Sequence, residues 1–207
     1  MLLRAVVALL AVSFCSVSSQ DQYCGVDVVF LLDASGSVGS YNFAKTLTFM
    51  DNVVDGLTIG PDDARIGLIR FSTYPYVQFY LNTYSDKQTY LSRVTYSGGA
   101  STNTGYALQR LRIESFTSST GHRSNVPKIA VVITGDKSPD VGQTSAEAQM
   151  ARNAGIILLT IGVGQSVDDA ELKAIASDPD SQNVHRAAAF DALSGLEDAF
   201  AATTCAI

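Results

Sequence analysis

Oxygen-bearing side chains gather in three short segments of the sequence. Residues 33–37 read DASGS and place a carboxylate and two hydroxyls at alternate positions. Residues 98–105 read GGASTNTG and carry several hydroxyls, and residues 134–140, TGDKSPD, add a carboxylate at Asp136. Hard divalent cations such as Mg²⁺ prefer oxygen ligands of this kind. The three segments together therefore predict a cation site, provided that the fold brings them to one place.

Each segment taken alone has a simpler interpretation. An Asp or Ser that follows a strand often caps the next helix. A polar loop that leads into a capped helix explains residues 98–105 equally well. Gly, Asp, Ser and Pro are ordinary turn residues, which would explain residues 134–140. The choice depends on whether the secondary structure places the segments at one edge of a sheet.

Apolar runs alternate with amphipathic stretches along the chain. Strands are expected at residues 26–32, 65–71, 77–81, 128–134, 156–163 and 184–186, and helices at residues 41–54, 87–94, 105–116, 145–154, 168–176 and 193–203. This alternation predicts a doubly wound α/β fold, with a mostly parallel sheet and helices on both faces. The short gap before residues 77–81 leaves no room for a parallel crossover, so this strand is predicted to be a short antiparallel edge strand. Such sheets bind ligands at the carboxyl ends of their strands, where residues 33–37 and 134–140 begin.

The composition excludes several classes of protein. The chain has 207 residues, of which 46% are hydrophobic and 16% charged, so it is not expected to be disordered. The formal net charge is −6 and no cluster of Lys or Arg occurs, which argues against nucleic-acid binding. The length suits one domain, which we assign to residues 20–207.

The first nineteen residues read as a secretory signal peptide. Arg4 precedes an apolar run at residues 5–14, and small residues follow it. The run is shorter than the roughly 20 residues needed to span a bilayer, although a membrane anchor is the alternative. The protein is therefore predicted to be secreted. Cys24 and Cys205 remain after removal of residues 1–19, and in an oxidising compartment they are expected to form a disulfide, the alternative being two free thiols.

An enzymatic function is not expected. The sequence contains no G-x-S-x-G, H-E-x-x-H or Walker A motif. His122 lies in a polar loop and His185 lies in or beside the last predicted strand, and neither belongs to a recognisable nucleophile–base arrangement. We therefore interpret both as solvated or hydrogen-bonded side chains.

Five segments, in this order, resemble the von Willebrand factor A domain family: DVVFLLDASGSVGSYNF, RIGLIRFS, GGASTNTGYAL, TGDKSPD and ILLTIGVG. The resemblance covers nearly all of residues 26–205 and implies the doubly wound fold. It also implies a metal-ion-dependent adhesion site, which would hold Mg²⁺ or Mn²⁺ on Asp33, Ser35, Ser37, Thr102 and Asp136. The terminal cysteines, Cys24 and Cys205, are similar to a pair found in the family.

The segment at residues 134–140 departs from the family pattern. The family turn reads T-D-G, whereas this chain has Thr134, Gly135 and Asp136 in the inverted order. A slip of one residue at the end of a strand turns a side chain to the opposite face, so Asp136 would depend on the turn, or on a bridging water, to reach the ion. Fewer anionic ligands would weaken the binding of Mg²⁺.

The resemblance also implies a function. In the family the cation accepts a carboxylate from a protein partner, so the chain is expected to be a secreted matrix or adhesion protein that binds a collagen or similar matrix protein. The partner is expected to meet a rim formed by Tyr41, Tyr74, Tyr76, Ser101 and Lys137. The alternative is a metal-independent structural or matrix-binding module with a degenerate ion site, which would also suit a mineralised matrix.

Overall fold

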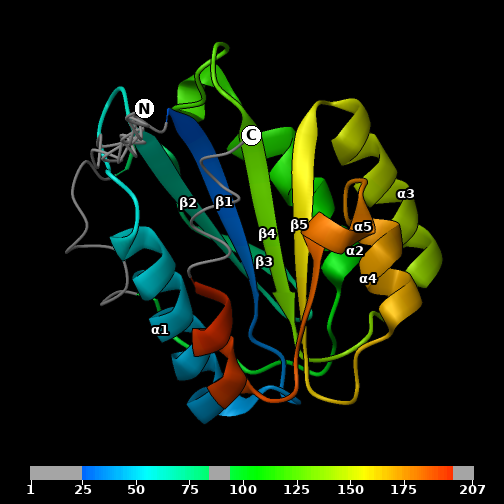
Figure 1. Cartoon of the computed structure of the whole chain (residues 1–207). Coiled ribbons are helices and arrows are strands. Elements are labelled where there is room, and N and C mark those ends of the chain that lie inside the picture. The colour runs from blue at the N-terminus through cyan, green and yellow to red at the C-terminus, as the bar shows by residue number, and fades with distance from the viewer. Residues whose placement is uncertain (1–24, 84–93, 198–207) are drawn as a thin grey trace, which may run out of the picture.

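The computed structural model describes residues 25–83 and 94–197. Their centre is a six-stranded sheet in the order β3-β2-β1-β4-β5-β6 (Figure 1). The strands are β1 (Val26–Asp33), β2 (Ala64–Phe71), β3 (Pro75–Phe79), β4 (Lys128–Thr134), β5 (Ile156–Val163) and β6 (Val184–Ala187). Every neighbouring pair is parallel except β2 and β3, which are antiparallel. The predicted fold class and its antiparallel edge strand are confirmed.

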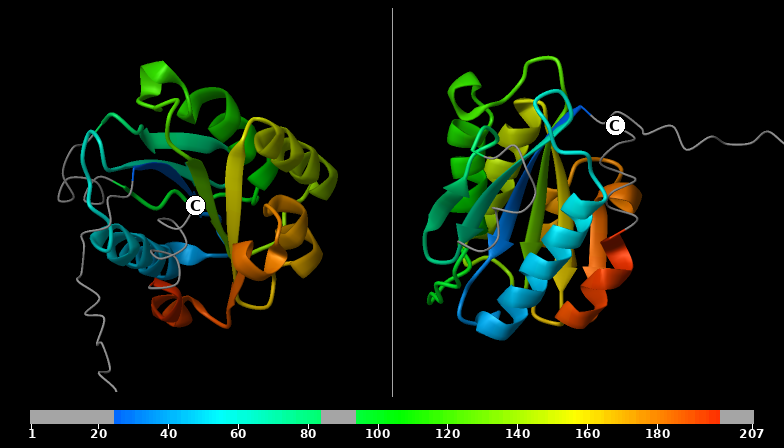
Figure 2. Two further views of the ribbon diagram at one scale, coloured as in Figure 1. Left: turned by 45° about the horizontal axis from the view of Figure 1, so that its top comes forward. Right: turned by 90° about the vertical axis from the view of Figure 1, so that its left-hand side faces the viewer.

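Helices join the strands on both sides of the sheet. They are α1 (Gly39–Asp55), α2 (Thr104–Arg110), α3 (Val141–Asn153), α4 (Asp169–Ile175) and α5 (Asp180–Asn183), with a π-helical turn η3 (Leu111–Ser115) and 3₁₀ turns η4 (Ser118–Thr120) and η5 (Phe190–Leu196). Figure 2 shows α1 and η5 on one side of the sheet and α2 and α3 on the other. Among the described residues, no helix is long and apolar enough to cross a membrane.

The central strand β1 is buried on both faces. Val28, Phe30 and Leu32 pack in the apolar cluster beneath α1 and η5. Val29 and Leu31 point the other way, into the cluster that contains residues of α2 and α3. Side chains alternate between the two faces of a strand, so a run without polar residues is what a sheet covered on both sides requires.

The predicted helices differ from the observed ones mainly at their ends. Residues 105–116 were expected to form one α-helix, but the α-helical part ends at Arg110 and a π-helical turn follows. The last element begins as a 3₁₀ turn at Phe190 rather than as a helix at residue 193. The signal peptide at residues 1–19, Cys24, Cys205 and most of the helix expected at 87–94 lie outside the described residues.

The order in which the chain adds strands to the sheet reverses between β1 and β4. The chain passes from β1 to β2 on one side and later returns to place β4 on the other side of β1. Leu32 pairs with Ile133, so Asp33 and Thr134 lie side by side at the carboxyl ends of these strands. This is the position at which doubly wound sheets bind their ligands.

Candidate metal centre

A cleft of about 470 Å³ opens at the carboxyl ends of β1 and β4. It is lined by Ser35, Ser37, Gly99, Ala100, Ser101, Thr102, Asp136, Lys137, Ser138 and Pro139. All three segments singled out in the sequence therefore meet here. Asp33 lies directly behind the cleft, because its carboxylate binds the backbone N–H of Ser35.

Asp33 is held firmly and is almost completely buried. Only 2% of its surface is exposed. Its Oδ1 accepts a hydrogen bond from Ser35 N at 2.9 Å, and its Oδ2 accepts from Gly135 N at 3.1 Å and from Thr134 Oγ1 at 3.0 Å. Burial raises the pKa of the Asp33 carboxyl, since desolvation outweighs these hydrogen bonds.

The neighbours of Asp33 supply hydrogen bonds but no positive charge. In the described part of the chain, the interactions that affect its pKa are burial and hydrogen bonds from neutral groups, and no Lys, Arg or His pairs with it. Asp27, at the other end of the same strand, is also buried but pairs with Arg123 at 2.8 Å and His122 at 2.8 Å. Buried carboxylates are ordinarily paired or bound to a metal, and of these two only Asp27 has a cationic partner within the described part of the chain.

The hydroxyls of Ser35 and Ser37 stand next to each other, with their Oγ atoms 3.0 Å apart. Ser35 is 2% exposed, whereas Ser37 is open to solvent at the cleft. The loop that carries Thr102 is fastened against them. Gly36 N donates to Gly99 O at 2.8 Å, and the Tyr96 hydroxyl donates to Ser35 O at 3.0 Å.

Thr102 is fixed from its other side by the turn between β2 and β3. Asn103, the next residue, donates from its backbone N to Ser72 O at 2.9 Å and from Nδ2 to Thr73 O at 2.7 Å. A Cβ atom at Gly99 would lie 2.5 Å from Ser72 Oγ, so only glycine allows the loop to approach the β2–β3 turn so closely. Thr102 is only 5% exposed and lines the cleft.

The inverted turn keeps Asp136 in the cleft. Thr134 Oγ1 lies 2.8 Å from Asp136 O and accepts from Asp136 N at 3.3 Å, which folds the chain back on itself. Asp136 Oδ1 accepts from Lys137 N at 2.8 Å, and the half-buried residue lines the same cleft as Ser35 and Thr102. The chain turns here, so the rule of alternating faces does not apply.

Gly135 occupies the position at which the family has its aspartate. A Cβ atom there would lie 3.1 Å from both Phe190 Cζ and Val38 Cγ2. Such contacts are tight, so the glycine lets η5 and the start of α1 close over the turn. An aspartate at this position would need Phe190 or Val38 to shift.

Of the five predicted rim residues, two line the cleft and the three tyrosines do not. Ser101 and Lys137 line the cleft itself. Tyr41 lies in the first turn of α1, 75% exposed, and Lys45 Nζ stands 4.2 Å from the centre of its ring. Tyr74 and Tyr76 are 62% and 51% exposed but do not line the cleft.

Tyr74 instead belongs to a second groove, of about 350 Å³, between β3 and the α2–η3 segment. Its lining includes Tyr106 and Ile113, which are 42% and 53% exposed. Tyr76 lies nearby on β3, with the Arg70 guanidinium 5.7 Å from its ring centre. The tyrosines are therefore surface residues rather than core residues.

Two site residues were not singled out from the sequence. Thr134 and the backbone N–H of Gly135 both bind Asp33 Oδ2. The sequence did contain a signal for Thr134, because this threonine ends a buried strand that was expected to lie beside the strand ending in Asp33. Backbone donors carry no side-chain signal, so the role of the Gly135 N–H required the structure.

The donor set suits a hard divalent cation. The cleft brings together hydroxyls on two loops, a second carboxylate and a buried carboxylate that has no positive partner in residues 25–83 and 94–197. Every candidate ligand atom is oxygen. Mg²⁺ and Mn²⁺ favour such oxygen sites, with waters completing the coordination. The residues present therefore fit the metal that the resemblance implies.

Comparison with known proteins agrees with this geometry. The sequence profile of the von Willebrand factor type A domain matches residues 27–199. Mouse matrilin-3 is 35% identical over 187 residues, which cover 88% of this chain and 38% of matrilin-3. The human collagen alpha-1(XXI) chain is 35% identical over 182 residues, covering 86% of this chain and 18% of that one. The chain thus spans well under half the length of these relatives.

Solved structures show the same fold. Proximal thread matrix protein 1 from the mussel byssus superposes with a TM-score of 0.82 at 26% identity, covering 88% of this chain and 49% of that one. A second structure of that protein has zinc in its MIDAS motif, the metal-ion-dependent adhesion site. It gives a TM-score of 0.79 at 28% identity, covering 88% of this chain and 47% of that one. With the profile match over most of its length, this chain belongs to the von Willebrand factor type A domain family.

Proposed function

We propose that this chain is a secreted matrix or adhesion protein that binds Mg²⁺ or Mn²⁺ and, through it, an acidic side chain of a matrix protein. The ligands are Asp33, Ser35, Ser37, Thr102 and Asp136. The observation that carries the proposal is the buried Asp33 carboxylate, which has hydrogen bonds but no cationic partner among the described residues. A divalent cation supplies the missing charge and a coordination position that a partner carboxylate can fill.

The chain's own residues prepare this contact. Hydrogen bonds from Ser35, Thr134 and Gly135 fix the orientation of Asp33, so little side-chain freedom remains to be lost when the ion binds. Lys137, exposed at the edge of the cleft, adds a positive charge that attracts an acidic partner. Ser101 offers a further hydroxyl to the partner.

Similar proteins support the choice of partner class. The relatives include matrilins and collagen chains, and one structural neighbour is a thread matrix protein with an ion in its MIDAS motif. A collagen or similar matrix protein is therefore the proposed partner, and residues 1–19 are the proposed secretion signal. We propose no enzymatic role, because His122 binds Asp27 and His185 binds the carbonyl of Gln182.

Calorimetric titration of Mg²⁺ and Mn²⁺ into the chelator-stripped protein tests the ion site. We expect one saturable site, with Ser37→Ala reducing the affinity by about tenfold or more, since each ligand contributes to a small set of donors. Ser37 is exposed, so the variant is expected to fold normally. Ser40→Ala is the matched control, because Ser40 is also exposed, at the start of α1, but does not line the cleft.

A folded wild-type protein that releases no heat at millimolar ion would refute the ion site. Binding of collagen to the immobilised protein, with and without EDTA, tests the second half of the proposal. We expect EDTA to abolish the binding and Ser37→Ala to weaken it at limiting ion concentration, whereas Ser40→Ala leaves it intact. Binding that persists in EDTA would contradict a role of the ion in the contact.

The second groove favours one alternative, a metal-independent matrix-binding module. Tyr74, Tyr106 and Ile113 form an exposed apolar surface beside β3, and exposed tyrosines are common in protein interfaces. If this groove is the contact, collagen binding resists EDTA and is lost in Tyr74→Ala. The two candidates therefore give opposite results in the same pair of measurements.

A further inference from the structure

A second buried carboxylate lies directly behind the loop that carries Asp136. Glu171, in the first turn of α4, is 5% exposed. Its Oε2 accepts from Ser138 N at 3.0 Å and its Oε1 accepts from the same group at 3.3 Å. The Ser138 hydroxyl also donates to Oε1 of Glu171. Both donors of Ser138 therefore point at one carboxylate.

Glu171 has no cationic partner among the residues that the structure describes. In the described ranges its only hydrogen-bond donors come from Ser138, and no Lys, Arg or His pairs with it. Glu147 on α3 is a useful contrast, because it is also 5% exposed but binds Arg112 at 2.9 Å and Gln109 at 3.1 Å. A buried carboxylate without a counter-ion depends on its hydrogen bonds, so Glu171 depends on the cleft loop.

Capping of α4 does not explain this arrangement. Asp168 already caps that helix, with Oδ1 accepting from Ala170 N at 2.8 Å and from Glu171 N at 3.4 Å. The Glu171 side chain reaches away from its own helix to a residue 33 positions earlier in the chain. Its contacts therefore serve the loop between β4 and α3.

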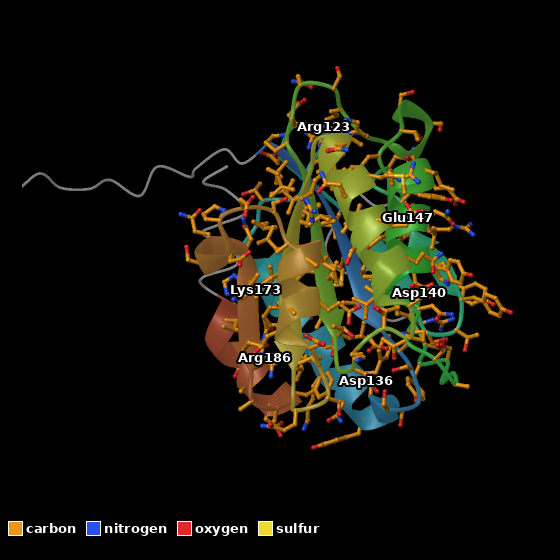
Figure 3. All side chains as sticks on the ribbon, turned by 90° about the vertical axis from the view of Figure 1, so that its right-hand side faces the viewer. Arg123, Asp136, Asp140, Glu147, Lys173 and Arg186 are labelled. Atoms are coloured by element: carbon orange, nitrogen blue, oxygen red, sulfur yellow. The ribbon has the colours of Figure 1, made fainter. Side chains whose placement is uncertain are left out.

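That loop forms one wall of the proposed ion site. Ser138 lines the cleft and follows Asp136 by two residues, and Lys137 N, between them, donates to Asp136 Oδ1. A shift of Ser138 would therefore move the carboxylate of Asp136. Figure 3 shows Asp136 at the lower end of the molecule, with Glu147 well above it along α3.

The contacts of Ser138 continue to the opposite wall. Ser138 Oγ lies 2.8 Å from Thr144 Oγ1, in the first half of α3. Thr144 packs against α2 at Gly105, where an added Cβ would lie 3.1 Å from Thr144 N. Gly105 follows Thr102 by three residues, so the same cluster supports both walls of the cleft.

We infer that Glu171 is a positioning residue for the ion site: through Ser138 it holds the Gly135–Asp140 loop so that Asp136 faces the cleft. The inference rests on the proposed function for its effect on ion binding, but the effect on the loop is independent of it. Glu171→Gln tests both effects. The amide keeps the shape of the side chain but turns an N–H₂ donor toward the donors of Ser138, so one of the hydrogen bonds is lost.

The first measurement is amide hydrogen exchange, resolved by residue in NMR spectra of the cation-free protein. In Glu171→Gln we expect the Lys137 and Ser138 amides to exchange about tenfold faster or more, because the loop loses a charge-assisted hydrogen bond. Glu147→Gln is the matched control, and it should leave these two amides unchanged. Unchanged loop exchange in Glu171→Gln, or equal acceleration in both variants, would overturn the inference.

The second measurement is the Mn²⁺ affinity of the same proteins. We expect a loss of about threefold to tenfold in Glu171→Gln and none in Glu147→Gln, even where the two variants unfold at similar temperatures. An affinity equal to wild type would overturn the link to the ion. If wild type itself binds no Mn²⁺, the proposed function fails and exchange alone decides the role of Glu171. Should Glu171→Gln not fold, Ser138→Ala removes the hydroxyl contact and is judged by the same amide at Lys137.

Discussion

Asp33 is almost completely buried and has no positively charged neighbour among the described residues, which affects its protonation. Burial raises the pKa of the Asp33 carboxyl above the ordinary value of about 4. Between that ordinary pKa and the raised one, the folded protein keeps a proton that the unfolded chain has released. The free energy of unfolding of the cation-free protein therefore falls as pH rises through this interval. A bound cation replaces the proton, so the stabilisation by Mg²⁺ should grow over the same interval.

Urea unfolding in EDTA and in saturating Mg²⁺, from about pH 4 to about pH 8, measures this dependence. We expect the difference between the two curves to widen with pH in wild type. In Asp33→Asn, which carries no titrating group at this position, the difference should be absent throughout. A stabilisation by Mg²⁺ that stays constant across the range would contradict the assignment of Asp33 as the proton-sensitive ligand.

Gly135 and Asp136 show how much of the site geometry can be predicted from residue order alone. A one-residue shift along a strand reverses the side-chain direction, so the inverted order predicted that Asp136 would reach the ion only through the turn or a bridging water. The structure has a turn at this point, held by Thr134 Oγ1, and Asp136 lines the cleft after all. The periodicity of a strand does not describe the turn that follows it, so the sequence alone left the position of Asp136 open.

The elements differ in how well the sequence predicts them. The bounds of β4 and β5 were predicted to the residue, because continuous apolar runs end where the sheet ends. Helix α3 was expected to begin at residue 145 but begins at Val141. Asp140 causes the difference, because its Oδ1 accepts from Gln143 N at 2.8 Å and caps the helix. The apolar periodicity of α3 is weak in that first turn, so only the cap marks its start.

The variant Asp140→Ala tests whether an acidic residue close to the cleft necessarily contributes to ion binding. Asp140→Ala should lower the free energy of unfolding by about 1 kcal/mol, the usual effect of losing an N-cap. It should leave the Mg²⁺ affinity unchanged, since Asp140 does not line the cleft. Urea unfolding and calorimetry measure the two effects, and Asp140→Ser, which retains a capping oxygen, should recover the stability. A loss of affinity in Asp140→Ala would instead make Asp140 part of the site.

The long-range contacts of the site are what the sequence does not reveal. Residues 33–37 and 134–140 were predicted to meet because parallel strands share an edge. Nothing in the spacing connects Glu171 with Ser138, because their contact depends on where α4 lies against the sheet. Ligands that follow strands are therefore predictable here, whereas the side chains that support them from a helix are not.

Across the whole molecule, the two ends of the sheet carry buried acids with different partners. Asp27 lies at the start of β1, and Asp33, six residues later, lies about 20 Å away along the strand. At the Asp27 end, Arg123 donates to Asp27 Oδ1 from Nε at 3.0 Å and from Nη2 at 2.8 Å. Figure 3 shows Arg123 and Asp136 at opposite ends of the molecule. One end thus has its cation built into the chain, and the other has an open cleft.

The variant Arg123→Met distinguishes the contribution of the Asp27 end to stability from that of the Asp33 end to ion binding. It leaves the Asp27 carboxylate buried without its main positive partner, so the free energy of unfolding should fall by about 3–5 kcal/mol. Arg123 also donates to the carbonyls of Val26, Pro61 and Asp63, so these hydrogen bonds are lost as well. The Mg²⁺ affinity of the folded fraction should nevertheless equal that of wild type, because none of these groups lies near the cleft.

Arg186→Met is the control for a surface ion pair. Arg186 lies 3.4 Å from Asp169, and the two side chains are 38% and 70% exposed, so its removal should change the stability by less than about 1 kcal/mol. If Arg123→Met weakened Mg²⁺ binding in protein that is still folded, the two ends of β1 would be coupled through the sheet. Equal affinity together with a large loss of stability would show that the Asp27 end stabilises the domain and that the Asp33 end is free to serve the ion.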